Sequence, residues 1–154
     1  MEVILLIISH RGNTDGPNSA YYGENHPSSI KNVLWQKFDC EIDCWFIENK
    51  FVLGHDKGEH EITQDFFYND KLWVHCKNIE ALYQLIDNPC VNAFFHDKDD
   101  AVLTSKKFIW TYPKNLHITN RSIAVLPELV EDWDFSKAHG ICTDFYKKYS
   151  GLFS

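Results

Sequence analysis

Two carboxylates stand two residues apart in a strand-length apolar segment, Glu41 and Asp43 within residues 37–46. Side chains at alternate positions of a β-strand share a face, so both acids point one way while the cysteines and isoleucine beside them point the other way. A buried pair of carboxylates is costly unless it binds a cation or shares a proton. The spacing therefore predicts a divalent-cation site. Oxygen ligands of this kind favour Mg²⁺ or Ca²⁺, with Mn²⁺ as a further candidate.

A second segment, residues 72–77, places Trp73, His75 and Lys77 on one face by the same alternation. If this segment is a neighbouring strand, His75 is a third metal ligand or an acid/base, and Lys77 can hold a phosphoryl oxygen. An imidazole ligand moves the metal preference toward Mn²⁺ or Zn²⁺. The simpler interpretation is a core histidine with a satisfied hydrogen bond and a lysine that faces solvent.

Two histidines follow apolar segments directly. His10, with Arg11, comes after an apolar run near the N-terminus, and His55 lies near the end of residues 51–56. Cleavage of a phosphodiester requires a group that activates the attacking hydroxyl, a second that protonates the leaving oxygen, and cations that stabilise the phosphoryl oxygens. These residues supply that set together with Lys77 and a metal, although an isolated strand-end histidine is more commonly structural than catalytic.

Eight short segments, rich in β-branched and aromatic residues, have the length of strands and could position this chemistry. They are residues 3–9, 37–46, 51–56, 72–77, 92–97, 108–113, 123–128 and 140–145. Helical patterns are fewer, and we expect helices at residues 28–37, 78–87 and 129–138. The polar segments 11–29 and 96–107 are expected to be loops.

Continuous apolar strands joined by connecting segments favour parallel pairing in an α/β fold. We expect a reduced (β/α) TIM-like barrel with short or missing helices, because 154 residues fall short of the ~250 residues of a full barrel. Such a barrel places its active site at the C-terminal ends of the strands. An open doubly wound sheet is the alternative, but the chain has only seven glycines and lacks a glycine-rich phosphate loop.

The composition limits the number of domains and the class of partner. Residues 1–154 are expected to form a single domain, and 44% hydrophobic residues indicate a packed core. The formal charge of -7 argues against nucleic acid as a general partner, because phosphate-backbone binding needs a surplus of Lys and Arg. A local cluster of carboxylates can still hold a cation, and through it an anionic substrate.

Targeting and redox signals are weak. The apolar run at the start is too short for a membrane span and lacks the features of a secretion signal, so it is interpreted as a buried strand. Five scattered cysteines without C-x-x-C spacing suit reduced thiols in a cytoplasmic protein. The sequence leaves the oligomeric state open.

Four short motifs follow one another along the first 60 residues: His10-Arg11-Gly12, Glu24-Asn25, Glu41-Ile42-Asp43 and His55-Asp56. This succession resembles the glycerophosphodiester phosphodiesterase family, whose hallmark is HRG, EN, E-x-D and HD in that order. The strand with Lys77 and the sequence GICTD at residues 140–144 also look like family features, less specifically.

The resemblance implies a TIM-barrel fold and a metal-dependent hydrolase that converts a small glycerophosphodiester to an alcohol and glycerol phosphate. By position it implies His10 and His55 as the acid/base pair, Glu41 and Asp43 as metal ligands, Arg11 and Lys77 as phosphate contacts, and Glu24 in a loop near the metal.

The chain differs from the family pattern in two respects. It is shorter, and it has His75 where the family usually has an acid two residues before the later lysine. A degenerate barrel that binds a phosphorylated ligand without turnover is therefore an alternative to an enzyme. A related branch, similar to phospholipase D toxins and phosphatidylinositol-specific phospholipases C, forms a cyclic phosphate, so hydrolysis and cyclisation both stay open.

Overall fold

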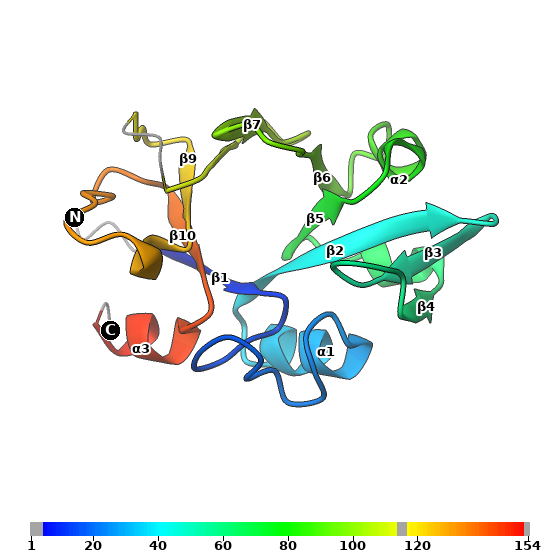
Figure 1. Ribbon diagram of the computed structural model, residues 1–154, viewed down its shortest axis with the longest axis horizontal. Coiled ribbons are helices and arrows are strands. Elements are labelled where there is room, and N and C mark those ends of the chain that lie inside the picture. The colour runs from blue at the N-terminus through cyan, green and yellow to red at the C-terminus, as the bar shows by residue number, and fades with distance from the viewer. Residues whose placement is uncertain (1–4, 114–116, 153–154) are drawn as a thin grey trace.

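A ten-stranded mixed sheet curls into a half-barrel in the computed structural model, which describes residues 5–113 and 117–152 (Figure 1). Eight strands run around the curl in the order β7 (Ala101–Leu103), β8 (Ile109–Thr111), β9 (Ser122–Val125), β10 (Gly140–Thr143), β1 (Leu6–His10), β2 (Asp39–Ile47), β5 (Leu72–Cys76) and β6 (Asn92–Phe95). Neighbours from β8 to β6 are parallel, whereas β7 is antiparallel to β8. The strands that carry the predicted site, β1, β2 and β5, are therefore adjacent.

An antiparallel hairpin extends the sheet beside the second half of β2. It consists of β3 (Lys50–Leu53) and β4 (His60–Ile62), and Cys44 pairs with Leu53 where β3 joins β2. The turn between the two strands requires glycine at position 54, since φ is +153° there and a Cβ would lie 1.9 Å from the Lys57 carbonyl oxygen. This turn carries His55.

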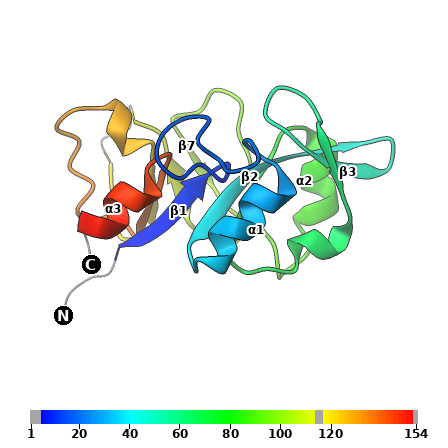
Figure 2. The same ribbon diagram turned by 90° about the horizontal axis from the view of Figure 1, so that it is seen from below.

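Three short helices cover the convex side of the sheet in the described part of the chain (Figure 2). They are α1 (Pro27–Trp35), α2 (Ile79–Leu85) and α3 (Tyr146–Leu152), with 3₁₀ turns at Gln64–Phe67 and Pro127–Leu129. His26 caps α1, since its Nδ1 accepts from the Ser28 amide at 3.0 Å, and the Asn78 side chain caps α2. None of these helices is long and apolar enough to cross a membrane.

The expected TIM-like (β/α) barrel is wrong. Strands and helices do not alternate around the sheet, and β3, β4 and β7 are antiparallel to their neighbours. The connections at residues 96–100 and 104–108 are too short for a crossover helix, which needs a dozen or more residues. The edges at β6 and β7 meet at the turn after β7, where Ala93 and Ser105 exchange hydrogen bonds of 2.8 Å.

Side-chain alternation divides the apolar residues into two cores, as the strand pattern predicts. The outer core packs between the sheet and the helices and includes Ile42, Val74 and Ile30. The inner core lies on the concave side and consists of Ile8, Trp73, Phe94, Trp110, Ile123, Val125 and Cys142. Because this inner core fills the base of the curl, the polar residues nearer the C-terminal strand ends are held above an apolar floor.

All eight expected strand segments overlap an observed strand, and the helices expected at 28–37 and 78–87 are confirmed by α1 and α2. The helix expected at 129–138 is wrong, since the described chain there is a 3₁₀ turn followed by irregular turns. Charged and aromatic residues in that segment repeat without a long apolar stripe, so burial does not favour a helix. Strands β4 and β7 and helix α3 were not expected from the sequence.

Candidate functional site

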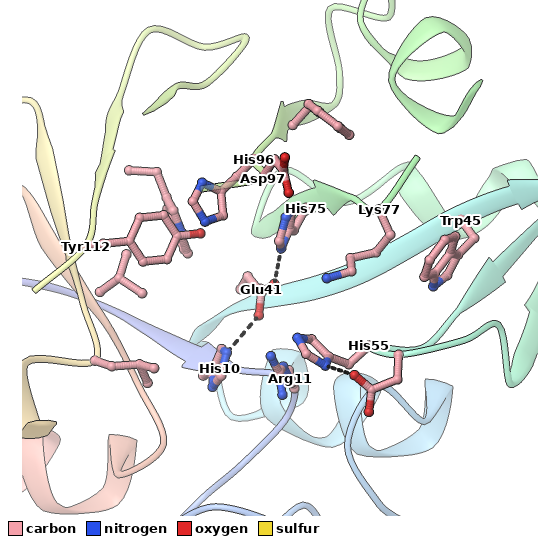
Figure 3. Close-up of a pocket in the computed structure, with 15 residues that line it drawn as sticks. His10, Arg11, Glu41, Trp45, His55, His75, Lys77, His96, Asp97 and Tyr112 are labelled. Atoms are coloured by element: carbon pink, nitrogen blue, oxygen red, sulfur yellow. Dashed lines mark hydrogen bonds and ion pairs between the residues drawn. The ribbon is translucent and has the colours of Figure 1, made fainter. Parts of the chain in front are cut away.

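A cavity of about 530 Å³ opens at the C-terminal ends of the parallel strands, above the inner core (Figure 3). This volume is within the range of about 300–1,000 Å³ that is usual for small-molecule sites. The lining residues are His10, Arg11, Glu41, Trp45, His55, Asp56, His75, Lys77, Phe95, His96, Asp97, Trp110, Tyr112, Val125 and Leu126. Every catalytic or phosphate-binding residue predicted from the sequence is among them.

The register of β2 and β5 brings the predicted metal ligands together. Asp43 pairs directly with His75, and Glu41 lies two residues earlier on the same face of β2. His75 Nδ1 is 3.1 Å from Asp43 Oδ1 and 4.0 Å from Glu41 Oε1. One ligand atom from each of the three residues lies within 4.8 Å of the others, and all three side chains are buried.

Asp43 is the fixed centre of this group. Its Oδ2 accepts from Asn25 Nδ2 at 2.9 Å and lies 3.0 Å from Arg11 Nε, and its amide donates to Asn25 Oδ1 at 2.8 Å. Burial alone would raise the pKa of Asp43, but the contact with His75 and the charge of Arg11 outweigh it and lower the pKa below its usual value. Asp43 is therefore a permanent carboxylate.

Glu41 is in a different electrostatic position. Burial, reinforced by the charge of Asp43, raises the pKa of Glu41 to about 7. Its Oε2 lies 3.8 Å from His10 Nε2 and makes no hydrogen bond. Glu41 therefore exchanges a proton near neutral pH unless a cation holds it in the charged form.

The donor set of this cluster fits a divalent cation. Three of its buried atoms have no hydrogen-bond partner: Glu41 Oε2, Asp43 Oδ1 and His75 Nε2. Such orphaned groups are costly, and a cation would satisfy the two carboxylate oxygens directly. Ligands at about 2.1 Å from one ion and at right angles lie about 3.0 Å apart, which is close to the 3.1 Å between His75 and Asp43.

His10 is oriented by a buried carboxylate at the end of the adjacent strand. Its Nδ1 lies 2.8 Å from Asp144 Oδ1, which follows β10, and Asn13 Nδ2 donates to the same oxygen at 2.8 Å. Since a carboxylate only accepts, Nδ1 carries the proton and Nε2 faces Glu41 and the cavity. Burial lowers the pKa of His10. The Asp144 hydrogen bond and the charge of Glu41 raise it by more, so the net change is an increase.

A backbone hydrogen bond holds the loop after β1 against β2. The Arg11 amide donates to the Glu41 carbonyl at 3.0 Å, and the Asn25 amide donates to the Arg11 carbonyl at 2.9 Å. Arg11 and Asn25 both have φ near +60°, a costly conformation for non-glycine residues that is often found at functional sites. Glu24 lies behind Arg11, with Oε1 3.6 Å from Arg11 Nη1, and does not line the cavity.

His55 and Lys77 line the opposite wall, nearer to solvent (Figure 3). His55 Nδ1 lies 2.8 Å from Asp56 Oδ1, and Trp45 Nε1 donates to the Gly54 carbonyl at 2.8 Å, which fixes the turn. Lys77 follows β5 and its amide donates to the Cys44 carbonyl at 2.8 Å. The structure thus places both histidines and both predicted phosphate-binding cations around one cavity.

Among the residues of the cavity region that have no role assigned from the sequence are His96, Tyr112 and Asp144. The His96 ring stacks on Tyr112 with centroids 4.2 Å apart, and its centroid lies 5.9 Å from that of His75. Each of the three stands two positions beyond an inner-core residue of its own strand, Phe94, Trp110 and Cys142 respectively. Extending the side-chain alternation past the strand end would have identified all three.

Comparison with protein-family models, with curated proteins and with solved structures found no match to this chain. The resemblance to glycerophosphodiester phosphodiesterases therefore stays a prediction that rests on four short motifs. The function is inferred below from the geometry of the cavity.

Proposed function

We propose that this protein is a divalent-cation-dependent phosphoric diester hydrolase that acts on a small glycerophosphodiester. The observation that carries the proposal is the convergence of a buried Glu41, Asp43 and His75 cluster with the Asp144-oriented His10 at one cavity. A carboxylate pair with unpartnered oxygens suits Mg²⁺, Ca²⁺ or Mn²⁺, and His75 adds a nitrogen ligand.

Glu41, Asp43 and His75 would hold the cation, and the cation would stabilise negative charge on the phosphoryl oxygens. Arg11 and Lys77 add positive charge to the lining of the same cavity. Arg11 is partly neutralised by Asp43 and Glu24, so Lys77 is the freer phosphate contact.

His10 Nε2 takes the proton from the attacking water, since its Nδ1 is already committed to Asp144. The water oxygen forms the new bond to phosphorus as the bond from phosphorus to the alcohol oxygen breaks. His55 gives a proton to that leaving oxygen from the opposite wall. One water is consumed, and the products are an alcohol and glycerol phosphate.

A second candidate is a binding protein for a phosphorylated ligand that has no turnover. It is favoured by His75, since a nitrogen ligand replaces a carboxylate, and by the 3.1 Å contact that ties His75 to Asp43. A weaker cation site would leave phosphate binding by Lys77 and Arg11 without the charge stabilisation that cleavage needs.

The test is release of alcohol and glycerol phosphate from a panel of glycerophosphodiesters with Mg²⁺, Ca²⁺ or Mn²⁺. We expect turnover by the wild type, loss of turnover in His10→Ala, and full activity in His139→Ala, a matched histidine whose ring contacts Phe108 at a tilt outside the cavity. No product with any of the three cations would overturn the hydrolase, and affinity without turnover would support the binding protein. A persistent cyclic phosphate would replace hydrolysis with cyclisation.

A further inference from the structure

Four exposed aromatic side chains gather over the outer face of α1. Their exposed fractions are 85% for Trp35, 74% for Tyr21, 60% for Tyr68 and 58% for Tyr22. In Figure 2, α1 lies in front of the sheet and no other described element covers it. A cluster of large aromatic side chains at this exposure is typical of a binding surface, because it leaves a continuous apolar area in water.

The spacing along α1 shows that these residues share one surface. Ser28, Lys31, Asn32 and Trp35 recur at helical intervals, and together with Tyr21 and Tyr22 they line a hollow of about 420 Å³. A second hollow of about 560 Å³ continues from the other side of Trp35. We call the residues that line these two hollows the α1 face.

The second hollow brings in the turn before β5, with Tyr68 and Asp70, and two further lysines, Lys37 and Lys71. Among the lining residues of both hollows there are three lysines, one aspartate and no arginine, which gives a local charge of +2. The whole chain carries a formal charge of -7. Positive charge is therefore concentrated on the face where the aromatic side chains are exposed.

We propose that the α1 face docks onto an anionic lipid surface. Trp and Tyr are the residues that settle at the headgroup level of a bilayer, because their rings are apolar and their tips are polar. Lysines beside them are attracted to anionic headgroups. A protein partner fits less well, since protein interfaces enrich arginine and deplete lysine, and the cations of the α1 face are all lysines.

The α1 face is connected to the cavity through the loop after β1. Tyr21 and Tyr22 belong to the loop that also carries Glu24 and Asn25, and the Tyr22 amide donates to Ser29 Oγ at 2.8 Å on α1. The loop and the helix are therefore one unit, which Asn25 joins to Asp43. The docking proposal does not depend on catalysis, because it uses no residue of the cavity lining.

The experiment is co-sedimentation of the full chain with vesicles of phosphatidylcholine alone and of phosphatidylcholine mixed with phosphatidylserine. We expect binding to the mixed vesicles only, and release at about 1 M salt, where the Debye length is about 3 Å. Trp35→Ala should weaken binding about tenfold, the effect of removing one large apolar contact. Lys31→Ala and Lys37→Ala should each weaken it about fivefold.

Matched controls lie on other surfaces of the chain. Tyr83→Ala removes a tyrosine on α2 that is 73% exposed, and Lys148→Ala removes an exposed lysine on α3. Both should bind mixed vesicles as the wild type does, and circular dichroism should show all five variants folded. Absence of vesicle binding, or equal binding by wild type and Trp35→Ala, would overturn the proposal. A dimer that Trp35→Ala dissociates, without vesicle binding, would also overturn it and identify a second copy as the occupant.

Discussion

Two histidine–aspartate pairs flank the cavity with the same geometry and different surroundings. The distance from His Nδ1 to Asp Oδ1 is 2.8 Å both in His10–Asp144 and in His55–Asp56. The exposed side-chain fractions are 13% and 10% in the first pair, and 41% and 92% in the second. The same contact is strong in a buried, low-dielectric position and weak in water. Only the first pair can fix a tautomer and hold a ring in place.

The surroundings of the buried pair come from the sheet. Strands β1 and β10 are adjacent and parallel, so their C-terminal ends place His10 and Asp144 side by side. The exposed pair comes from neighbouring residues in one turn, and Trp45 and Gly54 position that turn. We therefore expect His10 to act with a defined protonation state, and His55 to act through its location at the cavity mouth.

The largest predicted difference between the two pairs is at the histidines themselves. We expect His10→Ala to lower kcat about 1,000-fold and His55→Ala about 100-fold, within the range for loss of an acid or base. Steady-state turnover of a glycerophosphodiester with a saturating cation measures both. Equal losses, or a larger loss in His55→Ala, would show that burial of the His10–Asp144 pair gives His10 no advantage in catalysis.

Glu41, whose Oε2 lies 3.8 Å from Nε2 of His10 in the buried pair, should make that region sensitive to pH. Its pKa is about 7 in the folded chain against a reference of 4.5, so the stability it contributes is present below pH ~4.5 and is lost as the pH rises through ~7. The difference is on the order of 3 kcal/mol in the metal-free protein.

Denaturant unfolding of wild type and Glu41→Gln between pH 4 and pH 8 measures this effect, since subtraction removes the contribution of groups that do not interact with Glu41. The wild type should lose stability relative to Glu41→Gln as the pH rises, and a saturating divalent cation should reverse the loss. Parallel pH curves for the two proteins would show that Glu41 does not titrate in this range.

Replacing the aspartate of each pair should also have different effects in the two pairs. Asp144→Asn should lower kcat on the order of 100-fold. An amide, unlike a carboxylate, can donate a hydrogen bond to Nδ1 and so stabilise the wrong tautomer of His10. The acidic limb of the pH–rate profile should also move to lower pH, since Asp144 raises the pKa of His10. A loss of activity with an unchanged pH profile would mean that Asp144 has only a structural role.

The smallest effect is expected at the exposed aspartate. Asp56→Asn should change kcat less than about threefold, because a solvated ion pair is worth only about 0–1 kcal/mol. The same assay as for Asp144→Asn provides the matched measurement. A loss of more than tenfold would indicate that Asp56 becomes buried when substrate binds.

Alternation along single strands made much of the site predictable from the sequence. It identified Glu41, Asp43 and His75 as residues of one face, and the register of β2 with β5 is consistent with that prediction. It gave no information on which strands are neighbours, so the contact between His10 and Asp144, which are 134 residues apart, was not foreseen. Long-range pairing is set by the global packing of the sheet.

The fold prediction failed at the connections. Apolar strand segments look alike in a closed barrel and in a curled half-barrel, because both are covered on two faces over most of their length. The difference lies in residues 96–108, where a short antiparallel strand, β7, replaces a helix. That strand consists of only three residues, Ala101, Val102 and Leu103, and so short an apolar run within a polar segment does not distinguish a strand from a loop.

Calorimetric titration of Mg²⁺, Ca²⁺ and Mn²⁺ into wild type, Asp43→Asn and the surface control Asp134→Asn tests the cation site most directly. We expect the wild type and Asp134→Asn to bind at least one of these cations with one-to-one stoichiometry, and to cleave a glycerophosphodiester with the cation that binds best. Asp43→Asn should remain folded and lose both properties. Unchanged cation binding in Asp43→Asn, or no binding by the wild type, would contradict a metal-dependent hydrolase at this cavity.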